Sequence, residues 1–335
     1  MTDEARRGPT MHDVARLAGV SHVTVSRVLN DYPSIRPDTR ERVLAAIRQL
    51  GYRRNQAART LVTSRTRAIG VLAPAVPQHG PASSVLAVES AARAYGYHPL
   101  VTAAAVDHDA TVASLNFLLD QAVEALVVIA PHESVLAAIQ ELELTVPYVT
   151  LQAPDQASGV GVDQVAGAML AARHLIELGH RDIQHVSGPE PYLEAAARRR
   201  GFEQAILEAG LRLAPIIEGD WSAEFGYRSV ARLEPTTTAV VAANDQMAIG
   251  VIAALIDAGR SVPGEVSVVG FDDTPESAFV RPSLTTVHQD FDEVGRQAIE
   301  VLVAALAGTE PPIPHPIEPW LVVRDSTGRV AKPLR

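Results

Sequence analysis

The chain has 335 residues, of which 47% are hydrophobic and 20% are charged. This balance excludes a disordered chain and predicts a soluble protein with more than one domain. It contains no cysteine, which excludes disulfide frameworks, thiolate metal sites and cysteine nucleophiles. The first residues lack the apolar core of a signal peptide and no apolar run is long enough to cross a bilayer, so we expect a cytoplasmic protein with no membrane partner.

Charge is distributed unevenly along the chain. Residues 1–67 carry 13 Arg and no Lys against six acidic residues, a net charge of +7, whereas residues 68–335 carry 16 basic and 33 acidic residues, a net charge of −17. A basic segment on an acidic body is typical of a small domain that binds a polyphosphate. The alternative is a group of Arg-rich helices with solvated faces.

The basic segment predicts three short helices. Thr10 and Asp13 form the capping signature of a helix over about 11–18, which Gly19 ends. Ser21 caps a second helix, and a third begins at Pro37 and ends before Gly51. The apolar positions expected to form their common core are Val14, Leu17, Ala18, Val25, Val28, Leu29, Val43, Leu44, Ile47 and Leu50. The first two helices predict a helix-turn-helix, which places the start of its second helix in the major groove of DNA.

The motif TMHDVARLAGVSHVTVSRVLN at 10–30 resembles the opening signature of the lactose/galactose/purine repressor (LacI/GalR) family. The similarity continues through the segments 50–52 and 55–61 and covers nearly the whole chain. It implies a helix-turn-helix DNA-binding domain at 1–54, a hinge helix or linker at 55–66, and an effector-binding and dimerisation domain at 67–335.

The resemblance also implies how the hinge works. In the family this segment folds only on operator DNA, and a leucine from each protomer wedges into the minor groove at the centre of a pseudo-palindrome. By resemblance Leu61 is that wedge and Ala58 packs beside it. Family members commonly carry a proline before the hinge asparagine, where this chain has Arg54.

Side chains of the second helix and its surroundings are the candidate DNA contacts. His22 and Val23 hold the two positions that vary in the family and read base edges, and Arg27 suits a bidentate contact to guanine. The short polar groups suited to phosphate contacts are Ser21, Thr24, Ser26, Asn30, Tyr52 and Asn55. Two alternatives remain: Val23 packs within the head, and His22 touches only phosphate.

From Arg67 onward, short apolar runs alternate with helical stretches. The predicted strands are 69–72, 125–129, 183–186, 239–242 and 266–269, and the predicted helices include 83–95, 165–178, 194–209 and 246–258. This alternation predicts parallel sheets covered on both faces. The family resemblance implies a periplasmic-binding-protein-like α/β domain made of two doubly wound parallel-sheet subdomains. The expected N-subdomain spans about 67–160 and 291–319, and the expected C-subdomain spans about 161–290 and 320–330.

Five residues at strand ends, or in the loops after them, have the chemistry of a sugar site. Trp221 offers an apolar face to a pyranose ring, Arg198 and Asp272 suit charge-assisted bonds to pairs of hydroxyls, and Asn244 and Gln289 supply both donors and acceptors. Three of them have a structural alternative: Arg198 as part of a solvated run of arginines, Asp272 as part of a strand-end turn, and Trp221 as a cover over the core. The motifs GDWS at 219–222, ANDQM at 243–247, GFDD at 270–273 and TTVHQD at 285–290 look closer to the lactose branch of the family than to its purine branch.

The N-terminal lobe leaves the sugar undefined. In an ungapped alignment the polar contacts of the lactose branch fall on Ala105 and Ile129, which cannot hydrogen-bond hydroxyls. His79 resembles that branch locally, and either pairs with Glu276 across the lobes or is a surface histidine.

No catalytic, cofactor or metal motif stands out, and His174, His180 and His185 lack a metal-ligand pattern. We therefore expect no enzyme, but a homodimeric repressor that binds pseudo-palindromic operator DNA and is released by a small carbohydrate. The leucine heptads that end the lactose repressors are absent after residue 324, which favours a dimer. One alternative is a repressor that depends on a purine corepressor. A second alternative, of a different class, is a sugar-modifying enzyme fused to a DNA-binding head.

Overall fold

The structure is a computed structural model that describes residues 8–52, 65–76, 78–129, 132–152 and 159–330. The chain divides between Thr66 and Arg67 into two compact units, called the head and the body below. Within the described ranges, no helix is both long enough and apolar enough to span a bilayer.

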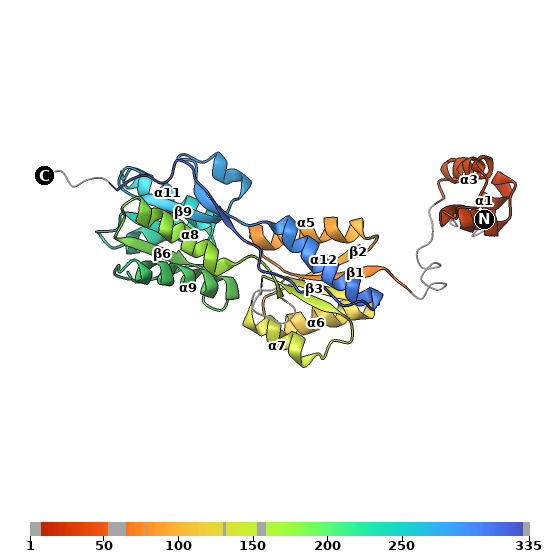
Figure 1. The fold of residues 1–335 in the computed structure, drawn as a ribbon, viewed down its shortest axis with the longest axis horizontal. Helices are drawn as coiled ribbons and strands as arrows, with labels where there is room; N and C mark the ends of the chain where they lie inside the picture. Colours follow the sequence, from red (N-terminus) through yellow and green to blue (C-terminus); the bar gives the residue numbers. More distant parts are fainter. Residues whose placement is uncertain (1–7, 53–64, 77, 130–131, 153–158, 331–335) are drawn as a thin grey trace, which may run out of the picture. The chain divides into compact units, whose positions relative to one another are not determined.

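Within residues 8–52, the head contains three helices: α1 (Met11–Ala18), α2 (His22–Leu29) and α3 (Pro37–Leu50) (Figure 1). Their ends follow the predicted caps. Thr10 and Asp13 form a reciprocal capping box at the start of α1, and Gly19 ends it with a φ of 65°. The Ser21 side chain caps α2, and Gly51 ends α3 with a φ of 61°. The capping chemistry is local, which is why the sequence predicts these boundaries so closely.

The predicted core of the head is wrong at two positions. Leu17 is 46% exposed and Leu44 is 38% exposed, whereas Ala15 and Ala46 are buried. At about 100° per residue, Leu17 lies about 60° from Val14, on the side away from Ala15 and Ala18. The smaller alanines lie at the centre of the buried stripe, so helices α1 and α3 pack closely there.

The body begins with a five-stranded parallel sheet of order β2-β1-β3-β4-β5. Helices α5 and α12 pack on one face of it, and α6 and α7 pack on the other. This N-lobe consists of β1 (Ala68–Pro74), α5 (His79–Ala94), β2 (His98–Ala104), α6 (His108–Asp120), β3 (Ala125–Ile129), α7 (Glu133–Glu141), β4 (Tyr148–Leu151), β5 (Gly159–Val160) and α12 (Phe291–Ala307).

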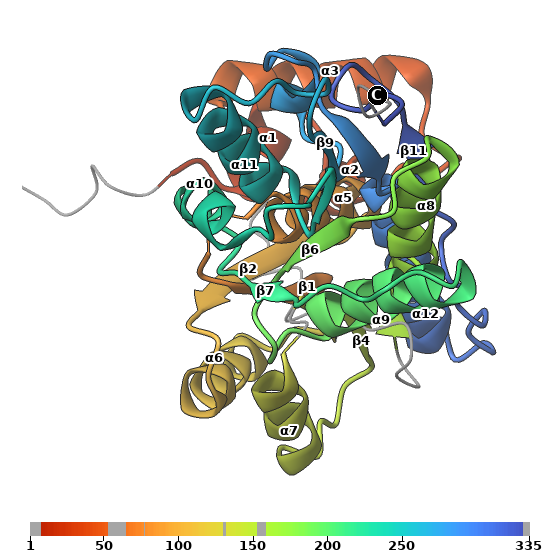
Figure 2. The ribbon, with the colours of Figure 1, turned by 90° about the vertical axis from the view of Figure 1, so that its left-hand side faces the viewer.

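The second sheet has the order β11-β10-β9-β8-β6-β7, and only β11 runs antiparallel to its neighbour. Helices α8 and α9 cover one face and α10 and α11 cover the other (Figure 2). This C-lobe consists of α8 (Gln164–Glu177), β6 (Ile183–Ser187), α9 (Leu193–Glu208), β7 (Ile217–Glu218), α10 (Ala223–Ser229), β8 (Ala239–Ala242), α11 (Asp245–Asp257), β9 (Ser267–Asp272), β10 (Thr285–His288) and β11 (Trp320–Val322), with short 3-10 turns η2 (Val230–Arg232) and η3 (Pro275–Ala278). Both lobes are doubly wound, which confirms the predicted fold class.

The chain passes between the lobes three times: after β5, after β10, and between Ile317 and β11. Beside the first passage, Val162 and Ile317 form an isolated parallel bridge. Three adjacent connections allow two rigid lobes to rotate against each other with little change inside either lobe.

Candidate functional site

The outer face of α2 carries the predicted base-reading residues. The Ser21 Oγ accepts from the Thr24 backbone N–H at 3.2 Å and lies 2.9 Å from the Thr24 hydroxyl. His22 and Arg27 are exposed, and Val23 is 45% exposed. Val23 therefore lies outside the core of the head, which excludes the alternative that it packs there. An apolar side chain left exposed at the start of a helix suits contact with a thymine methyl group.

The predicted phosphate contacts sit around this face. The Asn30 Nδ2 donates to the Ser26 carbonyl oxygen at 2.9 Å, so the Asn30 amide is oriented by α2 itself. The Arg27 guanidinium lies over the Tyr32 ring, 5.7 Å from its centroid. Tyr52 is half-buried against the core of the head. The remaining predicted contacts, Asn55, Ala58 and Leu61, lie outside the described residues.

In the body, the five residues predicted as a sugar site line one cavity between the lobes: Arg198, Trp221, Asn244, Asp272 and Gln289. Most of them follow directly from strand ends, since Asn244 comes after β8, Asp272 ends β9 and Gln289 follows β10. The carboxyl ends of parallel strands share one edge of a sheet, which is why separate segments converge there. The N-lobe closes the cavity with Gln78, Gly80, Pro81 and Gln152, and α9 adds Glu194.

Four buried side chains of this region form a continuous hydrogen-bonded relay. The Arg198 Nε donates to the Gln164 Oε1 at 2.8 Å, and the Gln164 Nε2 donates to the Gln289 Oε1 at 2.8 Å. The Gln289 Nε2 donates to the Asp272 Oδ1 at 2.7 Å, and that oxygen lies 3.5 Å from the Arg198 Nη2. The guanidinium also bonds the Ala243 carbonyl and lies 3.9 Å from the Phe271 ring centroid. The relay fixes Arg198 and Asp272 in one orientation each.

The Asp272 carboxyl is electrostatically unusual. Burial raises its pKa to about 8, and the neighbouring Arg198 opposes this rise. Its backbone φ of 112° lies in a region that side chains rarely adopt. A strained, buried carboxyl with a raised pKa is characteristic of functional sites.

Asp245 anchors the loop that follows Asp272. Its carboxylate accepts from the Thr274 backbone N–H at 2.8 Å, from the Ser277 hydroxyl at 2.6 Å and from the Thr286 hydroxyl at 2.5 Å. Burial raises the pKa of Asp245 to about 6, although each of these three hydrogen bonds acts to lower it. The start of α11, the loop after β9 and strand β10 are therefore held together beneath the cavity.

Trp221 and Asn244 depend on each other. The Asn244 Nδ2 donates to the Trp221 carbonyl at 3.0 Å and to the Gln246 Oε1 at 2.9 Å, while its Oδ1 accepts from the Met247 N–H at 2.9 Å and so caps α11. In this conformation Asn244 thus holds the Trp221 backbone, which has a φ of 70°, instead of offering its amide to the cavity. The Tyr192 ring meets the Trp221 ring edge-on, with 5.8 Å between centroids.

Sequence reasoning missed four residues of this region: Gln78, Gln152, Gln164 and Glu194. Gln152 follows β4, which the apolar pattern did not predict, and the other three lie at or next to helix starts without a local motif. The positions expected from the ungapped alignment, Ala105 and Ile129, line a separate small apolar pocket of the N-lobe.

His79 lies at the start of α5 and is half-buried. Burial lowers its pKa, and the negative charges of Glu276 and Asp273 in the C-lobe oppose this effect. Its Nε2 lies 3.1 Å from the Ser83 hydroxyl. His79 and Glu276 therefore influence each other electrostatically across the lobes.

The cavity has little free space. Its free volume is about 20 Å³, enough for about one water molecule. A ligand with the size of a sugar ring therefore requires the lobes to move apart or the lining side chains to turn.

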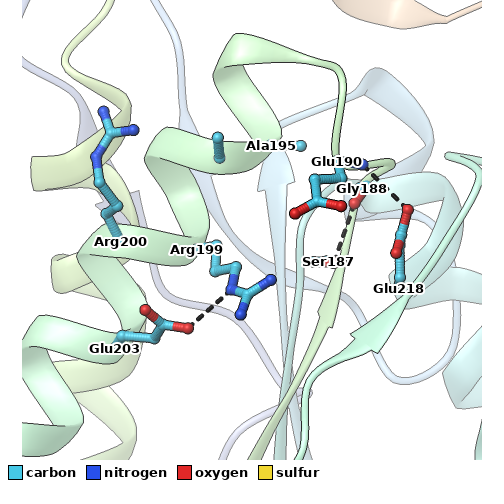
Figure 3. Close-up of a pocket in the computed structure, with 9 residues that line it drawn as sticks. Ser187, Gly188, Glu190, Ala195, Arg199, Arg200, Glu203 and Glu218 are labelled. Atoms are coloured by element: carbon cyan, nitrogen blue, oxygen red, sulfur yellow. Dashed lines mark hydrogen bonds and ion pairs between the residues drawn. The ribbon is translucent and has the colours of Figure 1, made fainter.

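A second pocket, of about 240 Å³, lies on the C-lobe beside α9 (Figure 3). Charged residues within the pocket hydrogen-bond one another. The Arg199 Nε donates to the Glu203 Oε1 at 2.8 Å, and the Glu190 backbone N–H donates to the Glu218 Oε1 at 3.1 Å. Gly188 lines this pocket and lies against Trp221, which lines the cavity: a Cβ built on Gly188 would lie 2.2 Å from the Trp221 ring.

The histidines considered as metal ligands have other partners. The His174 ring lies 2.9 Å from the Thr327 hydroxyl, His180 lies 3.0 Å from both the Thr238 hydroxyl and the Gly328 carbonyl, and His185 lies 2.8 Å from the Val241 carbonyl. Among the residues that the structure describes, no group of three or more His, Asp or Glu side chains is arranged to hold a metal ion.

The head and the body each match a known protein family. Residues 10–55 match the model of the bacterial regulatory proteins of the lacI family, and residues 172–327 match that of the periplasmic binding protein-like domain. The lactose operon repressor of Klebsiella pneumoniae is 34% identical, covering 97% of this chain and 94% of that protein. The transcriptional repressor PurR of Haemophilus influenzae is also 34% identical, covering 95% and 98%.

Among solved structures, the Lac repressor dimer bound to operator and the anti-inducer ONPF is similar, with a TM-score of 0.84 and 31% identity, covering 96% of this chain and 100% of that one. Both units, their order and nearly the full length are thus shared with these regulators. The chain belongs to the lacI family of bacterial regulatory proteins.

Proposed function

We propose that the protein is a homodimeric transcriptional repressor whose affinity for operator DNA falls when a small carbohydrate binds between the lobes. The observation that carries the proposal is the convergence of Arg198, Trp221, Asn244, Asp272 and Gln289 on one interlobe cavity. An aromatic face beside several fixed hydrogen-bonding groups is the chemistry that binds a sugar ring. The relatives alone do not decide the ligand, because a lactose operon repressor and a purine repressor are equally similar.

The head supplies the proposed DNA contacts. His22, Val23 and Arg27 form an exposed face at the start of α2, the part of a helix-turn-helix that enters the major groove. The positive charge of residues 1–67 supplies the sequence-independent attraction to phosphate. The hinge residues Asn55, Ala58 and Leu61 are proposed to complete the interface in the minor groove.

Exposed apolar side chains support the homodimer. Leu86 on α5 is 67% exposed and Val101 on the edge strand β2 is 45% exposed, while Tyr227 on α10 and Ile256 on α11 are 44% and 48% exposed. Such groups on both lobes fit a self-complementary surface that a second copy covers. Light scattering is expected to give the mass of a dimer, and a tetramer would contradict this.

Regulation is proposed to act through the three interlobe connections. A sugar that binds one lobe arrangement more tightly shifts the body towards that arrangement. The coupling to operator affinity is typically about 1–3 kcal/mol, or about 5- to 150-fold. We propose a regulator and not an enzyme, because Arg198, Asp272 and Gln289 are held in a hydrogen-bonded relay instead of presenting a base to a nucleophile.

The test begins with thermal-shift screening of neutral mono- and disaccharides against purine bases, since a ligand of the folded state raises the melting temperature. The operator is obtained by selecting bound duplexes from a random pool. Fluorescence anisotropy at fixed salt then measures whether the sugar that binds weakens operator binding. Stabilisation by purines alone would contradict the carbohydrate proposal, as would a sugar that tightens operator binding.

A further inference from the structure

The N-lobe side of the cavity presents two buried acceptors without a partner. Among the described residues, neither the Gln78 Oε1 nor the Gln152 Oε1 receives a hydrogen bond, although both atoms are buried. Gln152 is 4% exposed, and its Nε2 donates to the Ser84 hydroxyl at 3.3 Å, which fixes the amide. Both residues line the cavity. Because buried acceptors are nearly always satisfied in proteins, these two oxygens mark positions where a ligand donates.

The C-lobe side adds negative groups. Glu194 and Asp272 both line the cavity, whereas Arg198 is the one cation among the cavity's lining residues. The Arg198 donors point to Gln164, to the Ala243 carbonyl and towards Asp272, so much of the guanidinium is already engaged. The cavity therefore has a surplus of acceptors over donors.

The lining carboxyls also report on the electrostatic environment. Burial raises the pKa of Glu194 and that of Asp272, and Arg198 opposes both rises. The neighbouring Asp245 and Glu194 raise the pKa of Asp272 further, whereas the hydrogen bond from Gln289 lowers it. A site that already disfavours the ionised form of its own carboxyls also disfavours an anionic ligand. A phosphate group in the cavity would lie beside Glu194 and Asp272. The one cation of the lining, Arg198, already bonds Gln164 and the Ala243 carbonyl.

From this surplus we infer that the effector is an uncharged sugar without a phosphate or carboxylate group. Its hydroxyls donate to Gln78 and Gln152, and Glu194 is a specificity-determining residue that rejects phosphorylated sugars. This inference rests on the proposed function, because it names the ligand class of the same cavity. It separates the effector from the sugar phosphates, which offer the same ring and hydroxyls with added negative charge.

The first experiment compares neutral sugars with their 6-phosphates by thermal shift and isothermal titration calorimetry on the full chain. We expect a neutral sugar to bind and its 6-phosphate to bind at least about tenfold more weakly. A 6-phosphate that binds as tightly as the free sugar, or more tightly, overturns the inference and leaves the proposed carbohydrate function standing. Binding of purines alone, or of no ligand in the panel, overturns both.

Substitutions then test the individual residues with the neutral sugar identified in that screen. Gln152→Leu and Gln78→Leu remove the unpaired acceptors, and each is expected to weaken the sugar at least about tenfold. Gln78→Leu is not expected to lower the melting temperature of the ligand-free protein, because it removes an acceptor without a partner among the described residues. Gln152→Leu also removes the hydrogen bond to the buried Ser84 hydroxyl, so a modest loss of stability is expected for that variant. Gln140→Leu, on the exposed side of α7, is the matched control. Unchanged sugar affinity in both cavity variants overturns the inference.

The role of Glu194 has its own readout. Glu194→Gln keeps the shape of the side chain and replaces an ionisable carboxyl group with an amide that can donate, so the 6-phosphate is expected to gain about tenfold in affinity while the neutral sugar changes less than about threefold. Glu177→Gln, at an exposed site on α8, is the control. A parallel change in both ligands would show that Glu194 shapes the cavity without selecting against charge, and would overturn its assigned role.

Discussion

The side chains of Gln164 and Gln289 meet head to tail, although 125 residues separate them: the Gln164 Nε2 donates to the Gln289 Oε1 at 2.8 Å. Gln164 begins α8, and Gln289 lies where the chain leaves β10 for the N-lobe. Through this bond the orientation of Asp272 depends on a residue that does not itself line the cavity. The interlobe connection and the candidate ligand site are therefore mechanically coupled.

Replacing Gln164 with leucine breaks the relay at its centre. Arg198 loses the acceptor of its Nε and Gln289 loses the donor to its Oε1, so we expect a loss of about 1–3 kcal/mol in the free energy of unfolding. Sugar affinity is expected to fall as well, because Asp272 is no longer held. Urea unfolding and sugar titration measure the two effects, with Gln204→Leu on the exposed side of α9 as control. Stability equal to that of the control would contradict a structural role for the relay.

Replacing Gly188 with alanine tests the wall between the cavity and the neighbouring pocket. The new Cβ would lie 2.2 Å from the Trp221 ring, so the indole must move. We expect a loss of about 1–3 kcal/mol in stability from overpacking and weaker sugar binding, with operator binding retained in the absence of sugar. Trp221 fluorescence in a Trp320→Phe background reports the movement. An unchanged emission spectrum and sugar affinity would show that the wall adapts.

Replacing Arg198 with alanine is expected to give a repressor that holds operator DNA but no longer responds to sugar. Arg198 is 3% exposed and bonds Gln164 and Ala243, whereas its neighbour Arg199 is exposed and pairs with Glu203. Arg199→Ala is therefore the matched control. Operator anisotropy with and without sugar measures the response. Should the alanine variant fold poorly, Arg198→Met keeps most of the side-chain volume without the guanidinium, and a normal sugar response in that variant would remove Arg198 from the site.

Replacing Leu61 with alanine addresses the hinge proposed from the family resemblance. Loss of a wedge between base steps removes the contacts that the kinked duplex allows, so operator affinity is expected to fall while sugar affinity stays unchanged. Anisotropy and calorimetry on the same preparation separate the two. An equal loss of operator affinity and of sugar affinity would show that Leu61 supports the fold of the body and is not a specific DNA contact.

Stability is expected to fall in acid because of His185. Burial lowers its pKa to about 4, and the ring stacks on Phe202 with 4.9 Å between centroids. Between about pH 4 and the ordinary histidine pKa of about 6.5, the unfolded chain binds a proton that the folded chain refuses. The contribution is therefore complete above about pH 6.5 and is lost as the pH falls, by up to about 3 kcal/mol near pH 4.

Urea unfolding at several pH values between 4 and 7 measures this slope. His185→Gln is expected to flatten the slope whatever its effect on stability at pH 7, whereas His98→Gln, at an exposed site on β2, leaves the slope unchanged. A wild-type slope in the His185 variant would assign the acid sensitivity to other groups.

Helices that follow a local capping signal begin close to their predicted starts. Helices α8, α9 and α11 begin one residue before their predicted starts, since capping residues such as Asp163 and Asn244 are local signals. Helix α5 begins at His79, four residues before the predicted start at 83, because its first turn contains Gly80 and Pro81, which weaken the helical pattern. Six strands of the described residues escaped prediction: β2 is half-exposed, and β4, β5, β7, β10 and β11 have only two to four residues each.

The sequence by itself determined the caps and helices of the head, the alternation that makes both lobes doubly wound, and the C-lobe residues that line the cavity. Each of these depends on contacts within a few residues or on the fixed place of strand ends at one edge of a sheet. The tertiary structure alone decided that Gln164 joins Arg198 to Gln289 and that Asn244 holds Trp221. It also brought Gln78 and Gln152, whose side-chain oxygens have no partner among the described residues, to the same cavity. Such pairings join groups 23 to 125 residues apart, and a hydrogen bond at that separation depends on packing in three dimensions, which no local pattern encodes.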